Sequence, residues 1–385
     1  MNTKHSLTLC LLFAVASAYA AEPAGIPAKG YALFEKSGSF KPLEFQRHAV
    51  GEHDVLIEIL FSGICHSDIH TVRGEWGAVS YPLIPGHEIA GRVVQVGSGV
   101  TKFKVGDHAG VGCMVNSCRT CEQCRLDQEQ YCEKSRVLTY ADPDPFHGNE
   151  MTQGGYSDRI VVSQDFAIKI PDNADLAKVA PLLCAGVTTY SPLKFTHVGK
   201  DDEVAVAGFG GLGHMALQYA VALGAKVTVF DITEDKRADA MRLGAAKYIN
   251  VNHADEMAGL DSRFRVILST IPANYDPTVY MSMLKRDGEL VIIGVPAQDQ
   301  APRISIAALV HHGRRKIYGT AIGGIKETQE VVDYSVTNNI YPEIEIIPVQ
   351  KLDDAYANIL RGQVKFRYVL DMQSMRGNGQ PRDEQ

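Results

Sequence analysis

Four cysteines gather in one short stretch of the chain, and their spacing suits a metal site. The stretch CRTCEQCRLDQEQYC places Cys118, Cys121, Cys124 and Cys132 at steps of 3, 3 and 8 residues. Four thiolates can surround a tetrahedral Zn²⁺ and leave no position open, whereas neighbouring thiolates without a cation repel one another. Disulfide pairing is the alternative, but this spacing fits no simple pairing. The stretch therefore predicts a structural zinc site that stabilises the fold.

A second set of potential zinc ligands is scattered along the chain. Cys65 lies in GICHSDIH, His87 in PGHE and Cys184 in PLLCAG. Two thiolates and one imidazole bind zinc and leave a fourth position open, which is typical of catalytic zinc. Spacing alone does not bring Cys184 near Cys65, so the residues by themselves leave this site undecided. Cys113 stands alone and is expected to be a small inert hydrophobe.

A glycine-rich turn indicates a dinucleotide site. An apolar strand at 204–207 precedes the turn G-x-G-G-x-G, and an apolar-periodic helix and a strand at 227–230 follow it. Glycines there let the backbone approach a pyrophosphate, which the helix N-terminus stabilises. A glycine-rich turn without a ligand is the alternative, but the strand–turn–helix context favours binding. The predicted contacts are Gly208, Gly210, Gly211 and Gly213.

An aspartate at the end of the second strand bears on the choice of cofactor. Asp231 stands 23 positions after Gly208. A carboxylate there accepts hydrogen bonds from the ribose 2′-hydroxyl and repels a 2′-phosphate, so it favours NAD over NADP. Lys236 and Arg237 follow closely. They either offset part of that repulsion or are merely solvated.

The elements that must position these residues form two groups. A chain of 385 residues is long enough for two domains. Strand-like runs at 265–270, 289–295 and 316–321 alternate with helical stretches, which predicts a doubly wound parallel sheet. The earlier part has short β-like runs broken by Gly and Pro. The expected fold class is α/β, with a mostly β domain beside a parallel-sheet domain.

Composition and charge exclude few classes of function. The chain is 45% hydrophobic and 22% charged, which is ordinary for a globular protein. Its formal net charge of −7 offers no excess of positive charge to neutralise phosphates. Nucleic acid is therefore not expected as a partner.

The N-terminus has the pattern of a secretory signal peptide. A basic start leads into the apolar run LTLCLLFAV, and small residues ending in AYA follow. The apolar run is too short to span a bilayer. We expect a signal peptide over 1–21, an exported mature protein and no membrane attachment after cleavage. The alternative is an apolar first helix in a cytoplasmic protein.

Several long strings resemble one family. The chain resembles the zinc-containing medium-chain dehydrogenase/reductases, most closely their cinnamyl-alcohol-dehydrogenase-like branch, which includes bacterial broad-range aldehyde reductases. The likeness runs from about Lys29 to Asp371. It rests on GICHSDIH, YPLIPGHEIAGRVVQVG, GDHAGVGCMVNSCRTCEQC, TQGGYSDRIVV, APLLCAGVTTYSPL, GFGGLGHMALQYA and VKFRYVLD.

This resemblance implies a division of the chain into domains. A GroES-like catalytic domain is expected over 25–176 and is completed by 321–374. A Rossmann cofactor domain occupies 177–320, and a polar tail follows at 375–385. The resemblance also suggests a homodimer.

The resemblance further implies roles for single residues. Cys65, His87 and Cys184 would hold a catalytic zinc ion, with Glu88 as an interchangeable fourth ligand. Together with the four-cysteine site this makes two zinc ions per chain.

The remaining roles concern proton transfer and the cofactor. The hydroxyl of Ser67 would bond the reacting oxygen and connect through the cofactor ribose to His70 near solvent. Asp68 would orient His87 through its ring nitrogen. His66 and Arg367 match positions that approach the pyrophosphate.

The implied reaction is reversible hydride transfer between NAD(P)H and an aldehyde, aromatic or medium-chain, to give a primary alcohol. Trp76 is expected either to line a substrate pocket or to pack in a core or interface. The resembled branch mostly uses NADP, whereas Asp231 favours NAD. The alternatives are a polyol dehydrogenase of the same superfamily and an exported zinc-binding protein without activity.

Overall fold

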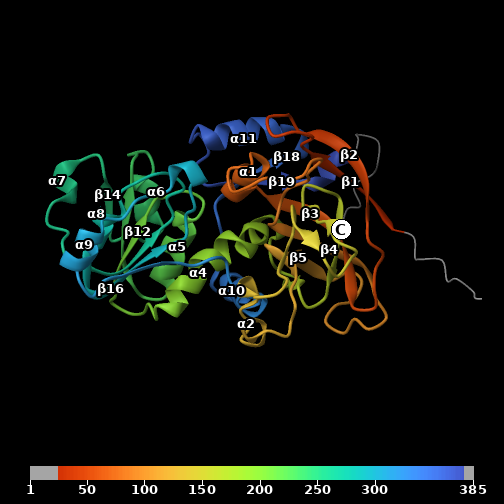
Figure 1. Ribbon diagram of the computed structural model, residues 1–385, viewed down its shortest axis with the longest axis horizontal. Coiled ribbons are helices and arrows are strands. Elements are labelled where there is room, and N and C mark those ends of the chain that lie inside the picture. The colour runs from red at the N-terminus through yellow and green to blue at the C-terminus, as the bar shows by residue number, and fades with distance from the viewer. Residues whose placement is uncertain (1–24, 377–385) are drawn as a thin grey trace, which may run out of the picture.

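The computed structural model describes residues 25–376 of the chain. The expected signal peptide at 1–21 lies outside the described residues, as does all but the start of the polar tail at 375–385. Among the described residues no helix is both long and apolar enough to cross a membrane. The described chain forms two bodies side by side, each built on its own sheet (Figure 1).

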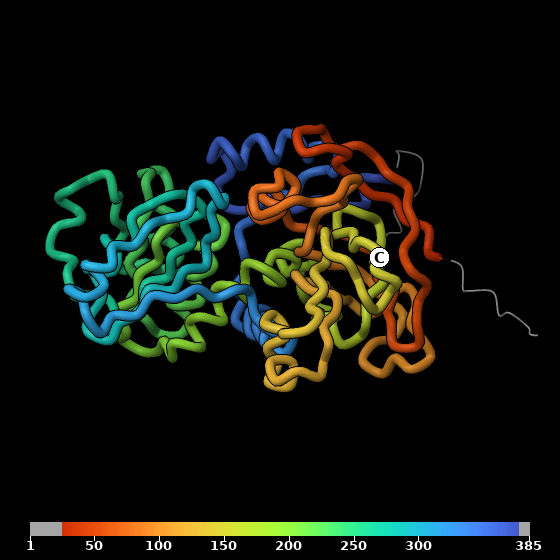
Figure 2. Tube along the Cα trace, in the orientation of Figure 1, coloured from red at the N-terminus to blue at the C-terminus, as the bar shows by residue number. Residues whose placement is uncertain are grey.

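The first body is built on a seven-stranded sheet in the order β11-β5-β4-β3-β19-β18, with β10 paired to β3. Its pairs are antiparallel except β18 with β19. The strands β18 and β19 come from the C-terminal part of the chain, which returns to this body (Figure 2). The strands are β3 (Asp54–Gly63), β4 (Ile89–Val96), β5 (His108–Val111), β10 (Arg159–Ser163), β11 (Ile168–Lys169), β18 (Ile344–Pro348) and β19 (Arg367–Asp371).

Short elements surround this sheet, as the runs broken by Gly and Pro predict. Three two-stranded antiparallel sheets pair β1 with β2, β6 with β7, and β8 with β9. Their strands are β1 (Ile26–Ala32), β2 (Lys41–Arg47), β6 (Met114–Asn116), β7 (Val137–Leu138), β8 (Pro143–Asp144) and β9 (Glu150–Met151). The helices are α1 (His66–Val72), α2 (Glu122–Arg125) and α11 (Leu352–Leu360), with single 3₁₀ turns at Glu129–Tyr131, Val349–Lys351 and Met372–Met375.

The second body holds a six-stranded sheet whose pairs are all parallel, in the order β14-β13-β12-β15-β16-β17. Its inner strands read as apolar runs because helices cover both faces of such a sheet. The predicted α/β fold with a doubly wound parallel sheet is thus confirmed. The strands are β12 (Glu203–Ala207), β13 (Lys226–Asp231), β14 (Lys247–Asn250), β15 (Phe264–Ser269), β16 (Leu284–Ile292) and β17 (Lys316–Gly319).

Helices complete the second body and connect it to the first. The helix α4 runs between the two sheets, with α10 beside it (Figure 1). One continuous core contains side chains of α4, α5, α10 and both sheets, so the two bodies are packed together rather than merely tethered. The helices are α3 (Leu176–Val179), a 3₁₀ turn at Ala180–Leu183, α4 (Ala185–Phe195), α5 (Gly213–Ala222), α6 (Arg237–Arg242), α7 (Ala254–Met257), α8 (Pro277–Ser282), a 3₁₀ turn at Gln298–Gln300, α9 (Ile306–His311) and α10 (Ile325–Asn338).

Candidate active site

The glycine-rich turn joins the central strand β12 to helix α5. Gly208 follows the strand with φ +92°, a left-handed conformation that favours glycine. A Cβ atom on Gly213, the first residue of α5, would lie 2.0 Å from the carbonyl oxygen of Gly208. These two glycines therefore make the turn tight. Gly210 has open space around its Cβ position, which leaves room for a ligand against the backbone.

Asp231 ends β13 beside this turn, and its carboxylate already has backbone partners. One oxygen accepts a hydrogen bond from the backbone N–H of Phe209 at 2.7 Å, and the other accepts from Ile232 N–H at 2.7 Å. The Nζ of Lys236 lies 4.0 Å from the first of these oxygens. Arg237 points elsewhere and is paired with acidic side chains on its own side of the sheet. Asp231 thus tethers the glycine-rich turn, a role that the sequence did not indicate.

The scattered ligand set converges at the junction of α1, β4 and α4. Cys65, His87, Glu88 and Cys184 are all buried, and one ligand atom of each lies within 4.8 Å of the others. The Nε2 of His87 is 3.2 Å from the sulfur of Cys184. Hydrogen bonding from Cys184 lowers the pKa of the Cys65 thiol well below its ordinary value. The donor set of two sulfurs, one imidazole and one carboxylate fits zinc.

Asp68 holds this group in place from inside the protein. Its Oδ1 is 2.9 Å from the Nδ1 of His87 and accepts the backbone N–H of Gly86 at 3.2 Å. Its Oδ2 accepts the N–H of Cys65 at 2.9 Å and the hydroxyl of Tyr156 at 3.0 Å. Burial opposes the charging of His87, but the Asp68 carboxylate raises its pKa well above the ordinary value. With Nδ1 engaged, Nε2 faces the ligand group, as the resemblance implies.

Arg367 connects the ligand group to the glycine-rich turn. It begins β19, and its Nη1 donates to the carbonyl of Ile64 at 3.0 Å and to Glu88 Oε1 at 3.1 Å. A Cβ on Gly211 would lie 3.0 Å from its Nη2. The Nε of Arg367 and Oε2 of Glu88 are buried without a partner among the described residues. Buried polar atoms normally have a partner, so these two atoms indicate missing ligands. The carboxylate oxygen fits a metal ion, and the guanidinium fits an anionic cofactor.

Ser67 and His70 both lie on α1, but their surroundings differ from expectation. The Oγ of Ser67 is 3.3 Å from the Nε2 of His87, which places the hydroxyl at the ligand group. His70 is only 5% exposed rather than near solvent. Its Nδ1 is 2.5 Å from Glu75 Oε2, and the Trp76 ring covers it with centroids 4.8 Å apart. The expectation that His70 lies near solvent is therefore wrong, because the loop after α1 folds back over it.

His66, on the same helix, has its ring centroid 4.9 Å from that of His70. Burial lowers the pKa of His66, which favours the neutral imidazole. Glu75 was not among the predicted site residues. The sequence feature that could have indicated Glu75 is its position in the loop directly after the helix formed by GICHSDIH.

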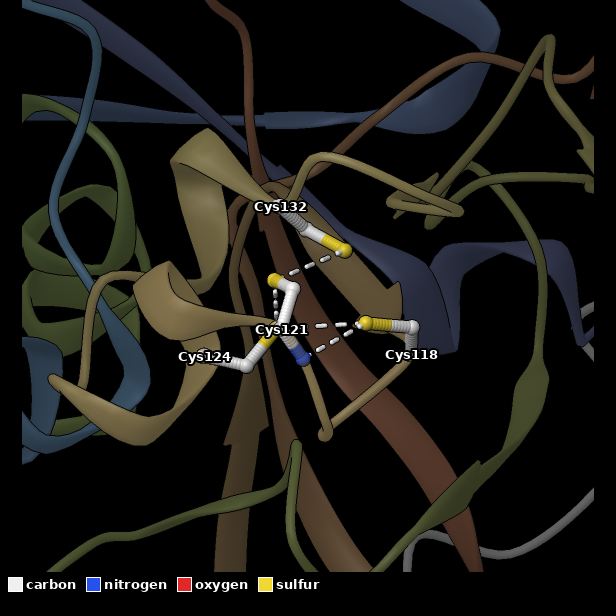
Figure 3. A group of neighbouring side chains, drawn as sticks. All are labelled: Cys118, Cys121, Cys124 and Cys132. Carbon is white, nitrogen blue, oxygen red and sulfur yellow. Dashed lines mark hydrogen bonds between the residues drawn. The ribbon is translucent and has the colours of Figure 1, made fainter.

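The four-cysteine lobe forms a compact group of its own (Figure 3). The sulfur of Cys121 lies 3.5 Å from that of Cys124 and 3.9 Å from that of Cys132, and Cys118 lies 3.9 Å from Cys124. Backbone N–H groups lower the pKa of Cys118 to about 6, whereas burial raises that of Cys124 to about 12. All seven cysteines among the described residues are free, and these four fit one tetrahedral zinc ion.

Comparisons with known proteins agree with this geometry. Residues 51–172 match the family model for the alcohol dehydrogenase GroES-like domain, and residues 211–337 match that for zinc-binding dehydrogenases. A probable formaldehyde dehydrogenase of Bacillus subtilis is 47% identical over 87% of this chain and 95% of its own length. The chain belongs to the zinc-binding dehydrogenase family.

Two further relatives place this dehydrogenase within the family. Cinnamyl alcohol dehydrogenase 2 of Rauvolfia serpentina is 43% identical over 90% of this chain and 95% of its own length. The crystal structure of CAD from Helicobacter pylori, complexed with NADP(H), is 51% identical, with a TM-score of 0.88 over 91% of this chain and 99% of that one. The resemblance to the cinnamyl-alcohol-dehydrogenase-like branch is confirmed.

In this dehydrogenase Trp76 lies where the two bodies meet. Its Nε1–H donates to the carbonyl of Pro296 at 3.0 Å, and its own carbonyl accepts from the side chain of Gln298 at 3.1 Å. The backbone N–H of Gln298 also donates to the carbonyl of Glu75 at 3.2 Å. Trp76 therefore packs one face on His70 and fastens the loop after α1 to the loop after β16.

Cys113 lies beside the ligand group of the dehydrogenase rather than in an inert apolar environment. Hydrogen bonding from Cys113, and then from Cys65, raises the pKa of the Cys184 thiol well above its ordinary value. Cys113 itself is half-buried, whereas Cys184 is buried. The expectation for Cys113 missed this contact because only the fold brings the end of β5 next to the start of α4.

Proposed function

We propose that the chain is a reversible, zinc- and NAD(P)-dependent alcohol dehydrogenase that reduces aromatic or medium-chain aldehydes to primary alcohols. The observation that carries the proposal is the convergence of Cys65, His87 and Cys184 beside the glycine-rich turn, with Arg367 in contact with both. When bound, zinc supplies a Lewis acid for the carbonyl oxygen and nicotinamide supplies the hydride.

The residues of the chain orient the reactants and move the proton. Asp68 holds the imidazole of His87, so that the ring keeps one orientation. Ser67 places its hydroxyl at the ligand group, where it exchanges a proton with the reacting oxygen. In aldehyde reduction His70 would supply the proton that replaces it, and in alcohol oxidation His70 would accept one, with the ribose of a bound cofactor as the link to Ser67. The Glu75 carboxylate, 2.5 Å from the Nδ1 of His70, would stabilise the charged ring.

The metal content we propose is two zinc ions per chain. The first would be held by Cys65, His87 and Cys184, with Glu88 as an exchangeable ligand, and the second by the four-cysteine lobe. The first group leaves room for a substrate, whereas four sulfurs close the second. Only the first therefore takes part in the reaction.

The test of the proposed function is an initial-rate assay of the zinc-loaded chain, with NADH and with NADPH for aldehyde reduction and with NAD⁺ and with NADP⁺ for polyol oxidation. Benzaldehyde, cinnamaldehyde and a medium-chain aldehyde are compared with sorbitol oxidation. We expect turnover of the aldehydes and little or none of sorbitol. Turnover of polyols alone would mean a polyol dehydrogenase, and no oxidation of either cofactor at full zinc occupancy would mean a protein without this activity.

For the cofactor we propose NAD, because the Asp231 carboxylate stands at the end of β13 where it repels a 2′-phosphate. We expect Asp231→Ser to raise the ratio of kcat/KM with NADPH to that with NADH by about tenfold or more, equivalent to about 1.4 kcal/mol. Steady-state rates with both cofactors measure the ratio.

Asp231→Asn is the matched control because its amide oxygen can still accept the N–H of Phe209. It should also raise the ratio while keeping the turn in place. A loss of activity with both cofactors and an unchanged ratio in the two variants would mean that Asp231 only tethers the turn.

Trp76 is proposed to set the preference for aromatic substrates. Its ring lies against His70, and its indole N–H reaches the loop after β16. We expect Trp76→Ala to lower kcat/KM for benzaldehyde about fivefold more than for propanal, since an aromatic contact contributes about 1 kcal/mol beyond burial. Equal losses for both aldehydes would mean that Trp76 only joins the two bodies. Trp76→Phe keeps an aromatic ring but loses the N–H bond to Pro296, so it separates the ring contact with the substrate from that hydrogen bond.

We further propose a homodimer formed through β17. This strand is the last in the order of the parallel sheet, so within residues 25–376 one of its edges has no partner strand and could pair with a second copy. The neighbouring helix α9 exposes Ile306 and Val310, at 72% and 73%. Light scattering coupled to size exclusion measures the assembly state.

Export of the mature protein is also a proposal, and its support is the leader pattern of residues 1–21. The alternative is an unprocessed cytoplasmic protein. The intact mass of the chain isolated from cells distinguishes the two, because cleavage removes the leader.

A further inference from the structure

A third group of potential metal ligands lies on the first body, outside the two cysteine-containing groups. His48 directly follows β2, Asp54 begins β3, and His147 lies in the turn between β8 and β9. One ligand atom of each lies within 4.8 Å of the others. These residues take no part in the proposed reaction, and the sequence does not place them together.

The two imidazole rings are stacked face to face, which brings their nitrogens close together. The ring centroids of His48 and His147 are 3.7 Å apart, and the ring planes differ by 11°. Two nitrogens bound to one tetrahedral zinc ion at 2.0–2.1 Å lie about 3.4 Å apart. The nitrogens therefore need to move little, but each ring must rotate about its side-chain bonds so that its in-plane lone pair points at the shared ion.

The hydrogen bonds of both rings leave a nitrogen lone pair free on each. The Nδ1 of His147 donates to Asp144 Oδ2 at 2.7 Å, and that of His48 donates to the carbonyl of Ala49 at 2.9 Å. Nε2 is then the free nitrogen of each ring. The Asp144 carboxylate thus orients the ring of His147, as in carboxylate–histidine–metal arrangements.

Two carboxylates of the cluster are poorly exposed to solvent. The Asp54 and Asp144 side chains are only 13% and 8% exposed. Within residues 25–376 the only ion pairs of these two carboxylates are with His48 and His147 themselves, and neither pairs with a lysine or arginine. Carboxylates this poorly solvated are normally paired with a cation or coordinate a metal. A divalent cation would balance their two charges.

We propose that His48, Asp54 and His147 form a further binding site for a divalent transition-metal ion, with Asp144 as a positioning residue. Two imidazoles and one carboxylate suit Zn²⁺, Ni²⁺ or Cu²⁺ rather than Mg²⁺ or Ca²⁺. The ion joins the segment after β2 to the β8–β9 turn and so ties two surface loops together. This site is independent of the proposed reaction.

The test uses zinc and the full chain. The chain is incubated with excess Zn²⁺ and desalted, and its zinc content is measured by plasma mass spectrometry beside that of His48→Asn/His147→Asn. We expect the unaltered chain to hold one more equivalent of zinc than the double variant. Isothermal titration of the desalted variants with Zn²⁺ gives the affinity, which Asp144→Asn should weaken about 10- to 100-fold.

His53→Asn is the matched control, because His53 lies in the same segment and its Nδ1 contacts the carbonyl of Gly99 outside the cluster. It should bind as much zinc as the unaltered chain. Equal zinc contents in the unaltered chain and the double variant would overturn the proposal, as would the same loss in His53→Asn. If the double variant does not fold, His147→Gln alone is compared with His53→Asn, and the same two results apply.

Discussion

Cys65→Ser abolishes aldehyde reduction and leaves the chain folded: this is the first expected result. The sulfur of Cys65 belongs to the buried ligand group, and a serine hydroxyl is a poor zinc ligand at neutral pH. Without the ion the carbonyl oxygen has no Lewis acid, so we expect kcat/KM to fall by about 10³-fold or more. Zinc content should fall by one equivalent, and the circular dichroism spectrum should be unchanged.

Cys113→Ser is the control for this experiment. Cys113 contacts Cys184 but is not one of the four residues of the ligand group. The variant should keep its zinc content. Full activity of Cys65→Ser, or loss of the same zinc equivalent in Cys113→Ser, would contradict the ligand set.

The second expected result is that Cys121→Ser mainly lowers stability. The four-cysteine lobe contacts the start of α10. There Glu129 accepts the N–H of Ile325 at 3.0 Å. Asp127 also forms an ion pair with Lys326 at 2.8 Å. Loss of the ion releases the lobe and these contacts. We expect the melting temperature to fall by about 5 °C, which corresponds to a loss of about 3–5 kcal/mol.

Scanning calorimetry measures the shift, and activity per remaining catalytic zinc ion should be nearly unchanged at 25 °C. A loss of activity without a change in melting temperature would mean that the lobe takes part in the reaction. Equal loss of folding in Cys65→Ser and Cys121→Ser would contradict the separation of a catalytic from a structural ion.

Much of the candidate site was predictable because its signals are local. The four cysteines of the lobe lie within one stretch, so a single excursion of the chain brings them together, and the structure finds their sulfurs in contact. The strand, glycine turn and helix are consecutive, so their order follows from short-range periodicity and glycine placement. The parallel sheet follows from the alternation of strands and helices.

Other features depend on contacts between distant segments, which no local pattern encodes. Cys184 meets His87 only because α4 begins beneath β4 and β5, and the same packing brings Cys113 to Cys184. The burial of His70 depends on a loop that returns over α1 and is held by Pro296 and Gln298 of the other body.

The amino-acid sequence by itself determined which functional groups the protein has: thiolates and an imidazole that suit zinc, and a glycine-rich turn that suits a dinucleotide. Tertiary structure decided which of those groups meet. It added Tyr156 to the Asp68 network and gave Asp231 a tether to the glycine turn. It also stacked His48 on His147. The reason is physical: a ligand group forms where separate strands and helices pack against one another, and that packing is set by the whole core.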